Sequence, residues 1–184
     1  MTPIKLCYTI LLGTLLTSCK FNCSVGESKS GVKTKAVSSD DETTLTGGVI
    51  KNDIELEATG VKLKAAYLLD AGENLLTENV TRVGEKIYIV IKTDTGWTKE
   101  NGKSFIGVAE RISTQSGHVV LDAADIFKDY ETTGLDADDA KLITISALIK
   151  NVVPGSENFV VQFRVWDKKG AGEIKGKYKF NIRK

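Results

Sequence analysis

The chain has 184 residues, of which 41 % are hydrophobic, and a formal net charge of +1. Lys5 is the one charged side chain among residues 1–18, so the rest of the chain carries 24 basic and 24 acidic side chains. A general nucleic-acid binder needs a basic surface, and this balance argues against such a partner. The three cysteines, Cys7, Cys19 and Cys23, lie near the N-terminus, which excludes a disulfide framework in a later domain.

A secretory leader is predicted at residues 1–18, where Lys5 precedes an apolar run and two small residues. The run, from Leu6 to Leu16, has about 11 residues, whereas a membrane-spanning helix needs about 20. The tetrapeptide Leu16-Thr17-Ser18-Cys19 resembles the lipobox of bacterial lipoproteins. This resemblance implies cleavage before Cys19 and lipidation of that cysteine. An ordinary signal peptide without lipid is the alternative.

The lipoprotein resemblance also implies a location. In lipoproteins of Gram-negative bacteria, an Asp after the lipidated cysteine favours the inner membrane, and this chain has Lys20 there. The resemblance therefore implies the outer membrane, in either leaflet. Two or more acyl chains anchor a protein stably, so a diacylglyceryl group on Cys19 would make the membrane a permanent partner.

Residues 19–46 are predicted to be a flexible tether that begins at the lipidated cysteine. Ser, Lys, Thr, Gly and Asp dominate this stretch, and its few apolar residues follow no period, so it has too little apolar surface to fold. A flexible chain of this length spans roughly 30 Å. The alternative is that its end adds a strand to the following domain, which is predicted to occupy residues 47–184.

From Gly47 onward, short segments alternate apolar and polar residues or are rich in β-branched ones, as strands do. The segment from Lys86 to Thr93 is apolar on both faces in its middle and is predicted to be a central, buried strand. Turn signals such as Asn101-Gly102 and Pro154-Gly155 separate the segments. The predicted strands before the C-terminal hairpin are residues 54–57, 61–69, 86–93, 104–112, 118–121 and 141–149.

The C-terminal stretch is the clearest predicted hairpin. Its loop is residues 168–172, and its two strands have one apolar and one polar face, so that one side meets the core and the other meets water. The apolar positions are Phe159, Val161, Phe163, Val165, Tyr178, Phe180 and Ile182, and the basic positions between the last three include Lys175, Lys177 and Lys179.

One helical crossover is predicted between residues 121 and 139. Asp122 stands at a position where its carboxylate would accept a hydrogen bond from a first-turn N–H, and the spacing repeats at Asp136. With seven or eight strands and one or two helical turns, the sequence predicts an all-β antiparallel β-sandwich. The order resembles immunoglobulin-like sandwiches of bacterial surfaces, although it lacks their antibody-type cysteine pair. A barrel is the alternative.

The same crossover is the candidate metal site. Calcium takes six to eight oxygen ligands, often from loop carboxylates. The alternative interpretation is that these acids are only solvated or cap helical turns. The candidate ligands are Asp122, Asp125, Asp136, Asp138 and Asp139.

The basic strand is the candidate surface for an anionic partner. Lys175, Lys177 and Lys179 project from one face and could contact lipid headgroups, a polysaccharide or an acidic protein. The alternative is edge protection, because lysines on a terminal edge strand discourage pairing with other chains.

Catalytic patterns are sparse. His118 is the single histidine, and a triad would have to combine it with Ser113 or Ser116 and Asp122, without a recognisable nucleophile elbow. The sequence therefore favours a lipid-anchored, non-enzymatic binding module with no cofactor, whose partner is an envelope protein or glycan. A calcium-dependent module and, less favoured, an envelope hydrolase are the alternatives.

Overall fold

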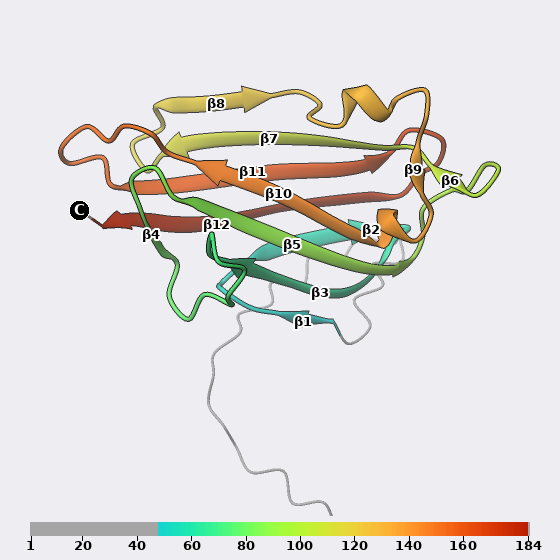
Figure 1. The fold of residues 1–184 in the computed structure, drawn as a ribbon, viewed down its shortest axis with the longest axis horizontal. Helices are drawn as coiled ribbons and strands as arrows, with labels where there is room; N and C mark the ends of the chain where they lie inside the picture. Colours follow the sequence, from blue (N-terminus) through green and yellow to red (C-terminus); the bar gives the residue numbers. More distant parts are fainter. Residues whose placement is uncertain (1–47, 184) are drawn as a thin grey trace, which may run out of the picture. The chain divides into compact units, whose positions relative to one another are not determined.

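The computed structural model describes residues 48–183, which form two packed β-sheets (Figure 1). Sheet A has the strand order β1-β3-β5-β10, and sheet B has the order β2-β12-β11-β7-β8, with β4 beside β12. Sheet A consists of β1 (Val49–Ile50), β3 (Lys62–Leu69), β5 (Lys86–Thr95) and β10 (Leu142–Leu148). Sheet B consists of β2 (Glu55–Thr59), β4 (Val80–Arg82), β7 (Ile106–Thr114), β8 (Val119–Ala123), β11 (Asn158–Asp167) and β12 (Glu173–Arg183).

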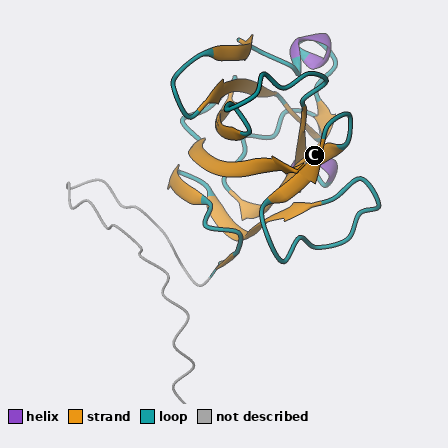
Figure 2. Ribbon diagram, turned by 90° about the vertical axis from the view of Figure 1, so that its left-hand side faces the viewer, coloured by secondary structure: helices purple, strands orange, loops and turns teal. Residues whose placement is uncertain are grey.

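The predicted all-β sandwich is confirmed, because the long strand pairs are antiparallel and the helical content of residues 48–183 is limited to two short turns. Two short pairs, β1 with β3 and β4 with β12, are parallel. A third, two-stranded sheet joins β6 (Lys103–Ser104) to β9 (Leu135–Asp136). Figure 2 shows the strands in layers, with the helical turns outside them.

The core lies between the sheets, where the alternation of β11 and β12 puts aromatic side chains inside. All seven apolar positions of the predicted hairpin are buried, and its loop falls between Asp167 and Glu173 as predicted. Phe159 and Phe180 are cross-strand partners and stack with their ring centroids 5.4 Å apart. Burial of each such side chain contributes about 1.5–3 kcal/mol, which makes this hairpin a main source of stability.

β5 is the central strand of sheet A, as its sequence predicted. It lies between β3 and β10, and Ile87, Ile89 and Ile91 are fully buried on its inner face. Val90, on the opposite face, is also buried. An apolar run on both faces therefore does mark a strand with neighbours on both sides.

The predicted helical crossover is partly wrong. Residues 119–123 continue as strand β8, so Asp122 lies in a strand and caps no helix. The helical turns come later, as the 3-10 helices η1 (Lys128–Tyr130) and η2 (Asp139–Lys141), and neither has a side-chain cap. Asp136 lies in β9. Pairing of β8 with β7 overrides the local capping preference, because it satisfies the backbone groups of a whole strand.

Candidate binding surface

The three predicted contact lysines lie on the outer face of sheet B. Lys175, Lys177 and Lys179 alternate along β12 with buried residues and point away from the core. β12 is an interior strand, because it pairs with β11 on one side and with β2 and β4 on the other. The edge-protection interpretation of these lysines is therefore wrong. The last strand of the chain is not an edge of its sheet.

Two of the three lysines have acidic partners. Lys177 Nζ lies 2.9 Å from Glu55 Oε2, on the neighbouring strand β2. Lys175 pairs with Glu173, which also receives a bond from Arg164. The hydrogen bond from Lys175 lowers the pKa of Glu173 most. Burial opposes this effect, and the bond from Arg164 lowers the pKa further, so that the net shift is downward. Lys179 is exposed and forms no ion pair with any residue in the range 48–183.

The basic residues form the middle of a row across the sheet. Cross-strand partners share one face of a sheet, and successive pairings link residues of β2, β12, β11, β7 and β8 in a line. The row reads Glu55, Lys177, Gln162, Arg111 and Asp122, so that acids lie at its two ends and the basic residues lie inside them, on either side of Gln162. We refer to this outer surface of sheet B as the basic face.

Two adjoining hollows lie near β12, and Lys177 and Lys179 line the smaller one. The smaller has a volume of about 200 Å³, and the larger a volume of about 500 Å³. Asp53 and Asn79 line both, so the two hollows adjoin each other, and we refer to the pair as the groove. The larger hollow is lined by Lys51, Asn52, Asp53, Leu76, Thr77, Glu78 and Asn79, and the smaller by Asp53, Glu55, Asn79, Lys177, Tyr178 and Lys179.

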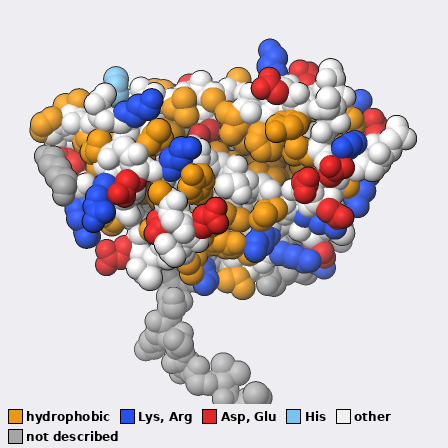
Figure 3. Space-filling view, viewed as in Figure 1, with side chains coloured by type: hydrophobic (Ala, Val, Ile, Leu, Met, Phe, Trp, Pro, Cys, Tyr) orange, Lys and Arg blue, Asp and Glu red, His pale blue; other side chains and the backbone are white. Residues whose placement is uncertain are grey.

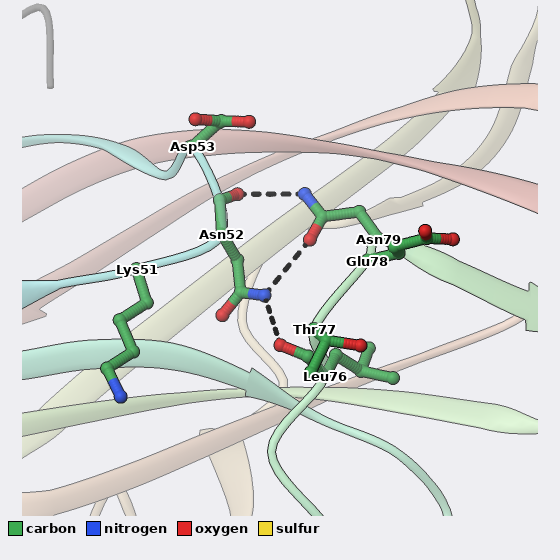
Figure 4. Close-up of a pocket in the computed structure, with 7 residues that line it drawn as sticks. All are labelled: Lys51, Asn52, Asp53, Leu76, Thr77, Glu78 and Asn79. Atoms are coloured by element: carbon green, nitrogen blue, oxygen red, sulfur yellow. Dashed lines mark hydrogen bonds between the residues drawn. The ribbon is translucent and has the colours of Figure 1, made fainter. Parts of the chain in front are cut away.

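Two asparagines hold the groove in shape (Figure 4). The Asn52 amide donates to the Leu76 carbonyl at 2.9 Å and to Asn79 Oδ1 at 3.1 Å, and it accepts a bond from the Leu68 N–H at 2.9 Å. The Asn79 amide donates to the carbonyl of Asn52 and to that of Lys179. Asn52 has φ 61°, a left-handed conformation that asparagine tolerates better than most residues.

The asparagine amides are committed to this network, so ligand contacts must come from the other lining residues. Figure 4 shows Lys51, Asp53 and Glu78 pointing away from the asparagine bonds. Together with Thr77 and Lys179 they offer both charges and a hydroxyl group. The sequence analysis missed Asn52 and Asn79. Their one local signal is the pair Asn52-Asp53, a combination that favours turns with positive φ.

The predicted calcium ligands do not gather at one place. Asp122 pairs with Arg111 at 3.4 Å, Asp136 with Lys103 at 2.9 Å, and Asp138 with Lys141 at 2.7 Å, while Asp139 has no ion-pair partner between residues 48 and 183. Hydrogen bonding to the Lys141 ammonium lowers the pKa of Asp138. Within the described part of the chain, no three His, Cys, Asp or Glu side chains are placed to hold a metal ion.

Asp125 has a structural role instead. Its carboxylate accepts bonds from the N–H groups of Val108 and Phe127 and lies 2.7 Å from Lys168 Nζ. Burial raises the pKa of Asp125, but the bonds from Lys168 and the two N–H groups outweigh burial, so the pKa is lowered. Asp125 therefore ties the loop after β8 to β7 and to the C-terminal hairpin.

A third residue that the sequence analysis missed carries a buried carboxyl group. Glu110 on β7 is 3 % exposed, and burial raises its pKa to about 7. Its inward position between Val108 and Ile112 was visible in the alternation of residues 104–112. Because this carboxyl lies inside the core, it is not open to a ligand.

The remaining candidates lie elsewhere. His118 is exposed before β8, and no hydrogen bond joins its imidazole to a serine or aspartate of residues 48–183. The lipidation candidate, Cys19, lies outside the described residues, as do the leader and the predicted tether up to residue 46. Between residues 48 and 183 there is no helix long and apolar enough to cross a membrane.

Comparison with known proteins adds one distant likeness. No family model matches the chain, and no curated protein matches it. Among solved structures, the chain is similar to the C-terminal domain of wzt, with a TM-score of 0.47 and 9 % identity over 74 % of this chain and 82 % of that one.

Proposed function

We propose that this chain is a lipid-anchored, non-enzymatic binding module of the bacterial envelope, which holds an acidic glycan at the groove beside β12. The lipobox-like sequence before Cys19 supports the anchor, and the polar composition of residues 19–46 supports a tether. In this arrangement the β-sandwich stands clear of the lipid headgroups, in the outer membrane, with its basic face available to the partner.

The observation that carries the proposal is Lys179, which lines the smaller hollow of the groove. Its neighbours Lys175 and Lys177 are paired with acids, whereas the Lys179 ammonium group has no acidic partner in residues 48–183. The Asn79 amide binds the carbonyl of Lys179 and so fixes the backbone of that lysine beside the hollow. An unpaired cation next to a preformed polar groove suits an anionic group of a ligand.

The rest of the groove favours a glycan over a lipid headgroup or an acidic protein. Its lining is mainly polar, and Leu76 is the one aliphatic residue among the residues that line the two hollows. Carboxylates such as Asp53 and Glu78, with the Thr77 hydroxyl, accept or share hydrogen bonds with sugar hydroxyl groups. A lipid tail or a large protein interface would call for more apolar surface.

The binding test uses polygalacturonate, a glycan with one carboxylate per sugar, and the full chain immobilised on a sensor surface. We expect measurable binding that weakens as salt concentration rises, because the attraction is electrostatic and exposed. Lys179→Glu should raise Kd at least about tenfold, whereas Lys86→Glu makes the same charge change on sheet A and should leave Kd within about twofold. An equal loss of affinity in both variants would show that only the net charge of the chain matters, and it would contradict binding at the groove.

Neutral dextran and a poly-glutamate peptide separate the other partner classes. If neutral dextran bound as tightly as polygalacturonate, the carboxylates of the glycan, and therefore Lys179, would not be needed for binding. Preference for the acidic peptide would make the partner a protein.

The anchor is tested separately by intact mass and membrane fractionation of the native protein, with Cys19→Ala beside it. We expect a lipid-sized mass increment that the variant lacks, and release of the variant into the soluble fraction. A variant that stays in the membrane after leader removal would contradict anchoring through Cys19.

A further inference from the structure

Strand β10 is a long edge strand without the usual protection. It pairs with β5 on one side, and it ends the order of sheet A on the other. Its seven residues, Leu142–Leu148, include no charge and no proline. Natural edge strands usually carry a lysine, a proline or a bulge, because a free row of N–H and C=O groups invites pairing with another chain. The pairing of β10 with β5 runs over all seven residues without a register shift.

The sequence of β10 is nearly the same in both directions. In antiparallel pairing about a two-fold axis at Ile145, every residue faces a chemically similar one. Leu142 would face Leu148 of the second copy, Thr144 would face Ser146, and Ile143 would face Ala147. Ile145 would face itself. Matched cross-strand pairs of apolar residues and of hydroxyl residues stabilise antiparallel sheets.

The charges at the two ends of β10 are also complementary. Asp139 precedes the strand and Lys150 follows it, both are exposed, and neither forms an ion pair within residues 48–183. Antiparallel pairing about a two-fold axis brings the start of one strand to the end of the other. Asp139 of one copy then lies at the same end as Lys150 of the second copy, twice in the dimer.

Exposed apolar residues lie on β8, the last strand in the order of sheet B. In Figure 1, β8 lies above β10, the edge strand of sheet A. Leu121 on β8 is the cross-strand partner of Ile112, whose side chain is buried in the core, so Leu121 points to the inner face, yet it is 39 % exposed. Figure 3 shows hydrophobic side chains gathered over this side of the molecule. The exposed hydrophobic residues of β8 and β10 are Val119, Val120, Leu121 and Leu142.

From these observations we infer that two copies of this chain associate through antiparallel pairing of their β10 strands. The two four-stranded sheets then join into one sheet of eight strands. Ile143, Ile145 and Ala147 stay buried in the core of their own copy, so the two copies meet along the backbone edges of their β10 strands and at the exposed outer residues of those strands. This inference is independent of the glycan site, because it uses the edge of the other sheet.

The test measures the mass of the full chain by sedimentation equilibrium in density-matched detergent, from about 1 to 100 μM, a range of ordinary transient affinities. Thr144 and Ser146 are exposed on the outer face, so substitutions there leave the core intact. We expect the unmodified chain to reach the mass of two chains. In the variant T144K/S146K, the new lysines of one copy face those of the second copy when the dimer forms. This repulsion should raise the dimer Kd at least about tenfold.

The matched control is T144K/S146E, in which each new lysine faces a glutamate of the second copy. This variant should dimerise like the unmodified chain, and circular dichroism should show that both variants stay folded. Any of three results would overturn the inference. They are an unmodified chain that is monomeric over the whole concentration range, a T144K/S146K variant that still dimerises, and a T144K/S146E variant that fails to dimerise.

Discussion

The carboxyl of Glu110 and the hydroxyl of Tyr178 are buried in the same core, on β7 and β12, the two strands that flank β11 in sheet B. Glu110 is 3 % exposed and Tyr178 is 1 % exposed, and neither Glu110 Oε1 nor the Tyr178 hydroxyl has a hydrogen-bond partner among the described residues. Burial, and then the charge of Glu110, raise the pKa of Tyr178 well above its usual value. The core therefore holds a carboxyl group whose pKa is raised by burial to about 7, so that its neutral form is favoured below that pH.

Stability should fall as pH rises from about 4.5 to about 7. Glu110 has a pKa of about 7 in the folded chain and an ordinary value of 4.5 when unfolded, so the folded state binds the proton more tightly. Its contribution is complete below pH 4.5 and is lost as pH rises through 7. The difference between the two pKa values corresponds to about 3 kcal/mol.

The measurement is urea unfolding at several pH values, with Glu110→Gln as the control. The glutamine has nearly the same shape and no titration, so the variant should lack the decline between pH 4.5 and 7. The acids with lowered pKa values, such as Asp94, whose carboxylate bonds Lys64, lose their contribution only as pH falls through the acid range. Parallel profiles of the two proteins would contradict the role of Glu110.

Gly107→Ala should disturb the packing of Trp166. A Cβ atom at position 107 would lie 2.2 Å from the Trp166 ring. The Arg164 guanidinium stacks over the same ring, 4.9 Å from its centroid. The indole must move, and we expect a loss of about 1–3 kcal/mol in the free energy of unfolding, with a shift in tryptophan fluorescence. In a Trp166→Leu background the same glycine substitution should cost less. An equal cost in both backgrounds would locate the strain in the backbone instead.

Asn52→Ala should destabilise the groove more than Asn52→Gly does. Both variants remove the bonds to Leu68 N–H and to the Leu76 carbonyl, but only glycine adopts φ 61° without strain. We expect a loss of about 2–4 kcal/mol for alanine and about 1 kcal/mol less for glycine, measured by urea unfolding. Equal losses would mean that hydrogen bonds alone decide the cost, and an unaffected alanine variant would contradict the network.

Calcium at millimolar concentration should leave the midpoint of thermal unfolding unchanged. Asp122, Asp136 and Asp138 each have a basic partner, and binding that favours the folded state would raise the midpoint. The measurement compares calcium with a chelator at equal ionic strength. A saturable rise that Asp136→Asn abolishes would restore the calcium hypothesis.

The sequence by itself determined which way the side chains of each strand point. Alternation has a period of two residues, so Phe159, Val161 and Phe163 had to share one face, and Lys175 and Lys177 the other. The all-β class and the C-terminal hairpin follow from the same local rule, together with the turn residues between strands. These features depend on residues close together in the chain.

The tertiary structure alone decided which strands are neighbours and which side chains meet. β12 became an interior strand because it pairs with β2, more than 100 residues earlier, and the Asn79 amide reaches the carbonyl of Lys179 across 100 residues. The same long-range pairing separated the crossover acids, buried Glu110 and left β10 as a free edge. Such contacts depend on the packing of the whole sandwich, for which no local period gives a signal.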